Sequence, residues 1–211
     1  MMPTSWPVTP TTPRQGPWMV RRRAYWSLLA GAFGFTYGHA SVWCSIAEHE
    51  RSFMSPVTWY EALGNEGAEQ MRYLRAFMDS LEPMTAVPCQ QIFTEDTRRE
   101  GTLETHAQAA VAEGYVCVYL PAGGSAELDV SSVWNGEGEV WYWNPATGEF
   151  SRERGQPAAM VNGRLTVTTP TEGEEQDWIV LLTRPGKGVP IKAIAAQAEE
   201  AQTEAKKVFE W

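Results

Sequence analysis

Residues 177–183 read Asp-Trp-Ile-Val-Leu-Leu-Thr, and Trp178 to Leu182 within them form an unbroken apolar run. A strand that is apolar at every position buries both of its faces, so this run predicts a central strand of a covered sheet. Four more strands are predicted upstream, at 115–120, 126–130, 139–143 and 164–169, with Asn-Gly and Pro-Ala-Gly-Gly turn residues between them. Short strands at this spacing predict an antiparallel β-sandwich over residues 85–184.

The chain before residue 85 follows a helical period instead. Pro17 to Gly31 predicts a helix that is buried on more than one side, and residues 33–37 predict a short apolar strand closed by Gly38. Thr58 and Glu61 have the spacing of a capping box, and a second helix is predicted from an Asn65 cap to Pro83. Its predicted buried face holds Ala68, Met71, Leu74 and Met78.

The two ends of the chain differ from both regions. Residues 1–17 hold five prolines among Thr and Ser, which predicts a disordered leader. Residues 185–211 predict a Gly/Pro linker and a C-terminal helix over about 190–209. Arg21 to Arg23 precede an apolar run as in a signal peptide, but Tyr25, Trp26 and Ser27 interrupt that run, so a buried helix is the preferred interpretation.

The composition excludes several classes of function. The chain has 211 residues and 10 Trp, and 26 acidic against 17 basic residues give a net charge of −9. That charge argues against nucleic-acid binding and against an anionic membrane surface. Three cysteines without short spacing predict neither a disulfide framework nor a metal site, and no cofactor motif occurs.

Several motifs together resemble one protein family. Residues 22–39 (RRAYWSLLAGAFGFTYGH), Trp59 to Leu63 and Gly67 to Met71 are similar to the end of the catalytic (β/α)8 barrel in apiosidase-like glycoside hydrolases. Residues 119–123, 141–148 and 177–182 resemble the β-sandwich that follows this barrel, a module called the "putative collagen-binding domain". The resemblance covers about residues 19–184. The chain departs from the family pattern at Glu66, where relatives carry Pro, and at Asn144 and Ala146, where they carry Asp and Arg.

The resemblance implies an α+β fold with four parts. They are a leader (1–17), the last strand and helices of a (β/α)8 barrel (18–84), an antiparallel β-sandwich (85–184), and a linker with a C-terminal helix (185–211). The resemblance implies that the catalytic acids of intact relatives lie on earlier barrel strands. No residue of this chain matches them, so no catalytic residue is predicted. Tyr37, His39 and Trp43 follow the last strand, on the face where a barrel binds its substrate, and are the predicted substrate-binding residues.

Side chains elsewhere have simpler interpretations. Glu48 and Glu50 are expected to be solvated loop charges, and His106 is expected on the surface. Trp141 and Trp143 alternate with Tyr142, so they share one sheet face, and packing between the two sheets is the preferred role over a carbohydrate platform. Residues 144–148 are predicted to form a turn. Collagen binding rests on the name of the module alone.

Two functions remain open on this basis. The first is the C-terminal part of a glycoside-hydrolase-like protein that is catalytically incomplete by itself, whose completed site would take a plant-type oligosaccharide. The second is a stand-alone module that binds carbohydrate or extracellular matrix. Whether the chain is an enzyme is left open. Apolar residues in 19–43 predict self-association, because the sandwich is expected to leave them uncovered. Localisation is left open: intact members of the family that the chain resembles are often exported, but no convincing signal peptide is found.

Overall fold

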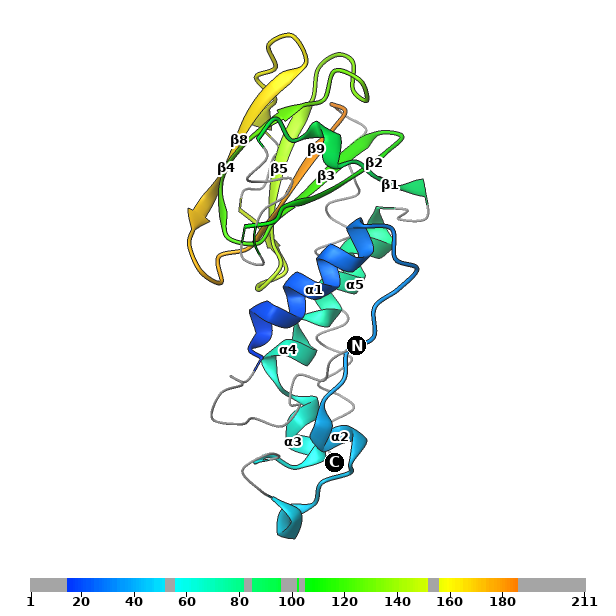
Figure 1. Ribbon diagram of the computed structural model, residues 1–211, viewed down its shortest axis with the longest axis vertical. Helices are drawn as coiled ribbons and strands as arrows, with labels where there is room; N and C mark the ends of the chain where they lie inside the picture. Colours follow the sequence, from blue (N-terminus) through cyan, green and yellow to red (C-terminus); the bar gives the residue numbers. More distant parts are fainter. Residues whose placement is uncertain are drawn as a thin grey trace.

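The computed structural model describes residues 15–51, 56–81, 85–95, 102, 105–151 and 156–185. Figure 1 shows the β-sandwich at one end, helices α1 and α5 lying across its lower side, and the short helices α2 and α3 at the opposite end. The predicted C-terminal helix at 190–209, most of the linker and residues 1–14 of the predicted leader lie outside the described residues.

The sandwich consists of a large and a small antiparallel sheet. The large sheet has the order β1-β2-β3-β9-β5-β6, with β7 also paired to β5, and the small sheet pairs β4 with β8. The strands are β1 (Val87–Pro88), β2 (Gln108–Ala112), β3 (Tyr115–Leu120), β4 (Gly123–Asp129), β5 (Glu139–Asn144), β6 (Glu149–Phe150), β7 (Gln156–Pro157), β8 (Arg164–Glu172) and β9 (Trp178–Thr183). The predicted central position of the 177–183 strand is confirmed, because β9 lies between β3 and β5.

The register of the large sheet divides its side chains between two apolar clusters. Leu181 lies opposite Cys117 on β3 and opposite Trp141 on β5. These three residues belong to a cluster on the helix-covered face. Their neighbours along the strands alternate into a second cluster, which packs against β4 and β8 and contains Val116, Val118, Val140, Val180 and Leu182. Both faces of the central strands are therefore buried, as the uninterrupted apolar sequence of β9 requires.

Helices α1 and α5 cover the first of these faces. The helices are α1 (Pro17–Leu29), α2 (Ala40–Trp43), α3 (Trp59–Leu63), α4 (Glu66–Glu69) and α5 (Met71–Ser80), with short 3-10 turns at Glu48–Glu50 and Gln90–Ile92. Tyr25 of α1 stacks on Tyr119 of β3 with ring centroids 5.2 Å apart. Phe77 of α5 packs on Trp143 of β5 at 5.5 Å. Rings of this size bury a large apolar surface, which helps to hold the helices on the sheet.

This arrangement corrects two expectations from the sequence. Trp141 and Trp143 do share a face, but that face meets the helices rather than the second sheet. The sandwich was expected to leave the apolar residues of 19–43 uncovered, yet buried residues of α1, among them Tyr25 and Leu29, form one cluster with the sheet. Both errors have one cause: the strand pattern shows that a face is apolar, and it does not show which element covers it.

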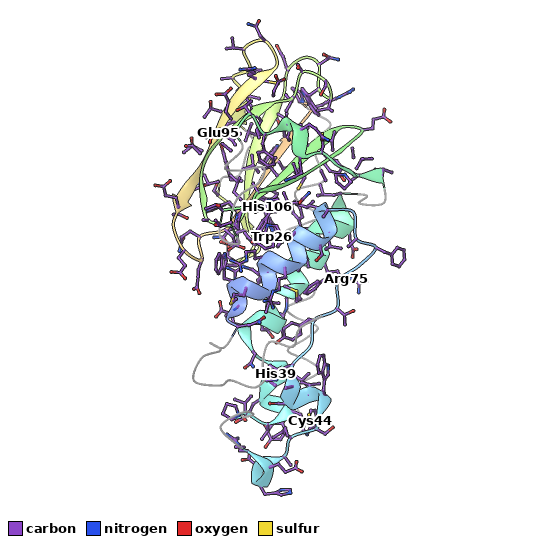
Figure 2. The ribbon with its side chains drawn as sticks, viewed as in Figure 1. Trp26, His39, Cys44, Arg75, Glu95 and His106 are labelled. Atoms are coloured by element: carbon purple, nitrogen blue, oxygen red, sulfur yellow. The ribbon has the colours of Figure 1, made fainter. Side chains whose placement is uncertain are left out.

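Polar contacts fix the position of α1 on the sandwich. Trp18 donates its indole N–H to the carbonyl of Pro121 at 2.8 Å, and Trp26 donates to the carbonyl of His106 at 2.9 Å. Figure 2 shows Trp26 and His106 side by side between α1 and the sandwich. His106, expected on the surface, is partly exposed and packs on the Trp26 ring. The guanidinium of Arg22 lies between the two indoles, 4.2 Å from Trp18 and 5.0 Å from Trp26. Cation–π attraction therefore supports these two contacts.

A buried ion pair lies at the centre of the same interface. Arg21 of α1 donates from Nη2 to Asp177 Oδ1 at 2.6 Å and from Nε to Asp177 Oδ2 at 3.1 Å. Tyr119 donates its hydroxyl to Asp177 at 3.1 Å, and Arg21 Nη1 donates to Gln70 Oε1 at 2.5 Å. The nearby carboxylate keeps the pKa of Arg21 raised even though burial works against the charge. A bidentate pair that is hydrogen-bonded on both sides fixes the orientation of α1.

The helical region departs from the predicted elements at two places. Residues 34–39 have no regular secondary structure, so the predicted strand at 33–37 is wrong; a strand exists only where a neighbour bonds its backbone. The predicted helix after Asn65 is present as two pieces, α4 and α5, which meet at Gln70. Leu74 and Met78 are buried as predicted, in the cluster that also contains residues of the sheet, whereas Ala68 and Met71 are only partly buried.

Candidate functional site

The end of α1 directs the chain toward the candidate site. Gly31 adopts a left-handed backbone with φ of 89°, and Ala32 N–H bonds back to the Ser27 carbonyl at 2.9 Å. Glycine ends helices in this way because it has no Cβ to clash in the left-handed region. The chain then runs through residues 32–39 to α2, which His39 caps and which ends at Trp43.

A groove lies between this segment and α5. It encloses about 720 Å³ and is lined by Leu28, Phe33, Phe35, Tyr37, Leu74 and Met78, among others. The Phe33 side chain is 94% exposed, and an ion pair between Arg75 and Asp79 lies on the α5 side at 3.2 Å. The self-association expected from the sequence stays a prediction, and this groove is the apolar surface that it would use.

His39 is held by contacts on both ring nitrogens. Its Nδ1 accepts the backbone N–H of Ser41 at 3.1 Å and so caps α2. An imidazole that accepts at Nδ1 carries its proton on Nε2 when it is neutral. Nε2 lies 3.1 Å from the side-chain amide of Asn65. Because Nε2 then carries the proton, the amide group of Asn65 is oriented so that its oxygen accepts this hydrogen bond. Asn65 stands at the predicted N-cap of α4, but its side chain makes no cap bond.

Tyr37 and Trp43 lie on different sides of His39 in the chain. The half-buried Tyr37 faces the groove, and its ring lies near Gly67, where an added Cβ would be 3.7 Å from it. The Trp43 indole lies against Gly38, where an added Cβ would come within 2.2 Å of the ring. Trp43 is nevertheless 53% exposed. The structure therefore places His39 and Trp43 together at α2 and puts Tyr37 in the groove.

A second group of polar and aromatic side chains lies beside α2, at the start of α3. We call it the α3 cluster: Glu48, Arg51, Trp59, Tyr60 and Glu61. Tyr60 donates its hydroxyl to Glu48 Oε1 at 2.5 Å. Arg51 bonds Glu48 at 3.1 Å and Glu61 at 2.7 Å. Trp59 N–H donates to the Ile46 carbonyl at 2.9 Å, which ties α3 to the loop after α2.

Part of this cluster was visible in the sequence. The predicted capping box is confirmed: Glu61 N–H donates to Thr58 Oγ1 at 3.3 Å, and Thr58 N–H donates to Glu61 Oε2 at 2.7 Å. The prediction that Glu48 and Glu50 are solvated loop charges is correct in exposure but omits their contacts. Glu50 accepts the Ala47 N–H at 2.8 Å, and Glu48 joins the cluster. No sequence spacing connects Glu48 with Tyr60, because a loop brings them together.

The carboxylates of the α3 cluster are held in their charged form. The Tyr60 hydroxyl, followed by Arg51, lowers the pKa of Glu48. The Thr58 backbone N–H, followed by its hydroxyl and Arg51, lowers the pKa of Glu61. A general acid in glycoside hydrolysis needs the opposite shift, which keeps a proton on the carboxyl near neutral pH. Both groups therefore suit hydrogen bonding and charge pairing rather than proton donation.

Other kinds of site find no support in the part of the chain that the structure describes. Within it, no three His, Cys, Asp or Glu side chains are grouped so that they could hold a metal ion. The same residues include no helix with the length and apolarity that a membrane crossing needs. Cys44 is exposed, Cys89 is partly buried, and Cys117 is buried in the sheet, where burial raises its thiol pKa.

Comparison with known proteins gives two adjacent family matches. Residues 4–85 match the model "Apiosidase-like, catalytic domain", and residues 87–183 match "Putative collagen-binding domain of a collagenase". A search of curated proteins gave no significant match. The chain is thus similar to a section of a glycoside hydrolase joined to a collagen-binding-like domain, which confirms the resemblance in the sequence motifs.

Solved structures support the same fold. One, titled "Glycoside hydrolase", aligns with a TM-score of 0.73 and 23% identity over 89% of this chain. Another, a glycoside hydrolase family 5 protein from Bacteroides vulgatus, aligns with a TM-score of 0.73 and 21% identity over 92% of this chain. The chain covers 42% and 44% of these two structures, less than half of each. The α+β fold is therefore shown.

Proposed function

We propose that this chain is the C-terminal section of a glycoside-hydrolase-like protein, in which α2 and the residues before it face the substrate. The observation that carries the proposal is the position of the exposed Trp43 at α2 and of His39, the N-cap of that helix. Residues that follow a strand line the substrate-binding face of a (β/α)8 barrel. The family resemblance gives residues 33–37 the place of the last barrel strand, although they form no strand in this chain. Trp43 would stack on a sugar ring, and His39 would hold α2 in place through its cap.

We propose further that the chain does not hydrolyse glycosides by itself. Hydrolysis needs two carboxyl groups flanking the scissile bond, and one of them must donate a proton. The carboxylates at α2 and α3 are already engaged: Glu48 and Glu61 with Arg51, and Glu50 with a backbone N–H. Neither Glu48 nor Glu61 has the raised pKa of a general acid.

In this proposal the sandwich supports the glycosidase-like section. Its large sheet contacts α1 through Asp177, Tyr119 and the Pro121 carbonyl, and contacts α5 through Trp143. The alternative function, a stand-alone module for carbohydrate or extracellular matrix, would need an exposed binding face. Trp141 and Trp143 do not provide one, because the helices cover them. A plant-type oligosaccharide is the proposed ligand of the completed substrate face.

The test is an activity assay on the purified chain with aryl glycosides and pectic oligosaccharides. We expect no turnover above buffer, because no carboxyl in the α3 region is poised to donate a proton. Glu48→Gln and Glu50→Gln variants are the matched controls. Turnover that either substitution abolishes would overturn the proposal that the chain is catalytically incomplete.

A further inference from the structure

The exposed aromatic residues of this protein are unevenly distributed. Among the described residues, the aromatic side chains with large exposed surface are Phe33, Trp43, Trp59 and Tyr60, and all lie between residues 33 and 60. The large hydrophobic residues that the described sandwich exposes are valines, such as Val161. A single exposed apolar residue needs no explanation, but a group of rings around two short helices does.

Two of these rings form a fixed pair. Trp59 and Tyr60 lie edge to face, with centroids 5.5 Å apart and ring planes at 86°. They are 43% and 44% exposed, so each keeps a large part of its surface open to solvent. The bond from the Tyr60 hydroxyl to Glu48 and the bond from the Trp59 backbone to Ile46 restrain both residues. Restrained rings lose little entropy when a ligand stacks on them.

Charged groups adjoin the ring pair and are held in place by one another. Arg51 lies between Glu48 and Glu61, and Glu61 is itself fixed by Thr58. A guanidinium and two carboxylates offer several donors and acceptors in planar arrangements, which suits neighbouring hydroxyl groups. Two carboxylates and one guanidinium carry a net charge of −1, which favours a neutral ligand over an anionic one.

We propose that the α3 cluster binds neutral carbohydrate, with a sugar ring stacked on Trp59 or Tyr60 and its hydroxyl groups bonded to Glu48 and Arg51. The choice of a sugar as the ligand rests on the proposed function above. The proposal adds a surface that the predicted site residues Tyr37, His39 and Trp43 do not include. An aromatic platform bordered by ionised side chains gives stacking and hydrogen bonding at once, which a polyhydroxylated ring requires.

The test is native gel electrophoresis of the full chain through gels that contain soluble xyloglucan, arabinoxylan or polygalacturonate. We expect the neutral polysaccharides to retard the chain and polygalacturonate to leave its mobility unchanged. Trp59→Ala and Tyr60→Ala should each weaken the retardation about five-fold, as expected for the loss of one stacked ring. Val161→Ala is the control, since Val161 is 71% exposed and lies on the sandwich, outside both the cluster and the proposed substrate face. Thermal unfolding of each variant verifies that it is folded.

The outcomes separate this inference from the proposed function. If no neutral polysaccharide retards the chain, or if both variants are retarded as strongly as the parent chain, the α3 cluster is not a carbohydrate site. Loss of retardation in Trp43→Ala alone would keep the substrate face at α2 and overturn the inference. If light scattering shows a dimer that Trp59→Ala dissociates, the cluster is a protein interface, and the inference is also overturned. Retardation by polygalacturonate would contradict the charge argument.

Discussion

The two ends of the helical region differ in burial and in the kind of contact that holds them. At the sandwich, Tyr25 and Phe77 are fully buried against Tyr119 and Trp143, and the Arg21–Asp177 pair closes the interface. At α2 and α3, Trp43 and Trp59 are about half exposed, and the ion pairs of Arg51 face solvent. Figure 1 shows these regions at opposite ends of the helical part.

The difference shows which region holds the fold and which is open to a ligand. Burial of a large side chain stabilises a fold by about 1.5–3 kcal/mol, whereas exposed ion pairs contribute about 0–1 kcal/mol. The interface that α1 and α5 form with the large sheet therefore determines the stability of the fold. The surface at α2 and α3 contributes little to that stability. Substitutions in the two regions should divide accordingly.

The largest effect is expected from removing the helices altogether. A chain that starts at Thr85 would expose the apolar sheet face that contains Tyr119, Trp143, Ile179 and Leu181. We expect this shortened chain to bind a hydrophobic dye and to aggregate in size-exclusion chromatography with light scattering. A monodisperse monomer with the thermal stability of the full chain would contradict the view that the helices complete the core of the sandwich.

The same substitution, Phe to Ala, can be made in both regions, at Phe77 and at Phe33. Phe77 is fully buried between Tyr25 and Trp143, and Phe33 is 94% exposed. We expect Phe77→Ala to lower the free energy of unfolding by about 3–5 kcal/mol, because it leaves a cavity in the interface. Phe33→Ala should change it by less than about 0.5 kcal/mol. Chemical denaturation of both variants measures the difference, and equal losses would reject the division.

The buried ion pair gives a third test. Asp177→Ala would leave the Arg21 charge buried without its partner, and breaking a buried pair costs about 3–5 kcal/mol. We expect the lower end, about 3 kcal/mol, because Gln70 still accepts a hydrogen bond from Arg21. Asp129→Ala is the control, since Asp129 is partly exposed and its partner Arg164 lies on the surface. A loss below about 1 kcal/mol for Asp177→Ala would show that the pair does not hold α1.

A contact between a turn and a helix should have a smaller effect. Gly148 closes the turn after β5 with φ of 72°, and an added Cβ there would lie 2.4 Å from the Tyr73 ring of α5. Alanine at this position combines backbone strain with a clash, so we expect Gly148→Ala to cost about 1–3 kcal/mol. A Gly148→Ala, Tyr73→Ala double variant should recover the part due to the clash. No recovery would assign the cost to the backbone alone.

Residues 144–148 also show what the sequence could and could not provide. The turn was predicted from Asn144 and Gly148, and the strands β3, β5 and β9 were predicted from their period, since local chemistry determines both. The contact with Tyr73 joins residues 75 positions apart, and no local pattern contains it. β2 was missed because its sequence, Gln-Ala-Ala-Val-Ala, has little β-branched or aromatic character.

The candidate site divides in the same way. The Thr58–Glu61 cap was predicted because its spacing is local, and Tyr37, His39 and Trp43 were chosen through the family resemblance. The partner of the His39 ring, Asn65, lies 26 residues further along the chain, and the Glu48–Tyr60 bond crosses a loop. Non-local hydrogen bonds of this kind become visible only in three dimensions.

The smallest effect is expected from pH at the α3 end. The Thr58 N–H and hydroxyl lower the pKa of Glu61, so the folded α3 end binds a proton at Glu61 more weakly than the unfolded chain does. This contribution to stability is therefore complete above the unfolded pKa of Glu61 and is lost as the pH falls through its lowered folded value. As the pH is lowered from neutral to about 3, the intrinsic exchange rate falls, and exchange of the α3 amides should slow by less than this intrinsic rate does. The protection factors of the α3 amides should therefore decrease, while those of the β3 and β9 amides stay high. Glu61→Gln should remove most of this pH dependence, because a neutral side chain can still accept the Thr58 N–H. If the β9 amides lost protection together with those of α3, the two regions would unfold as one unit, and the division between them would be wrong.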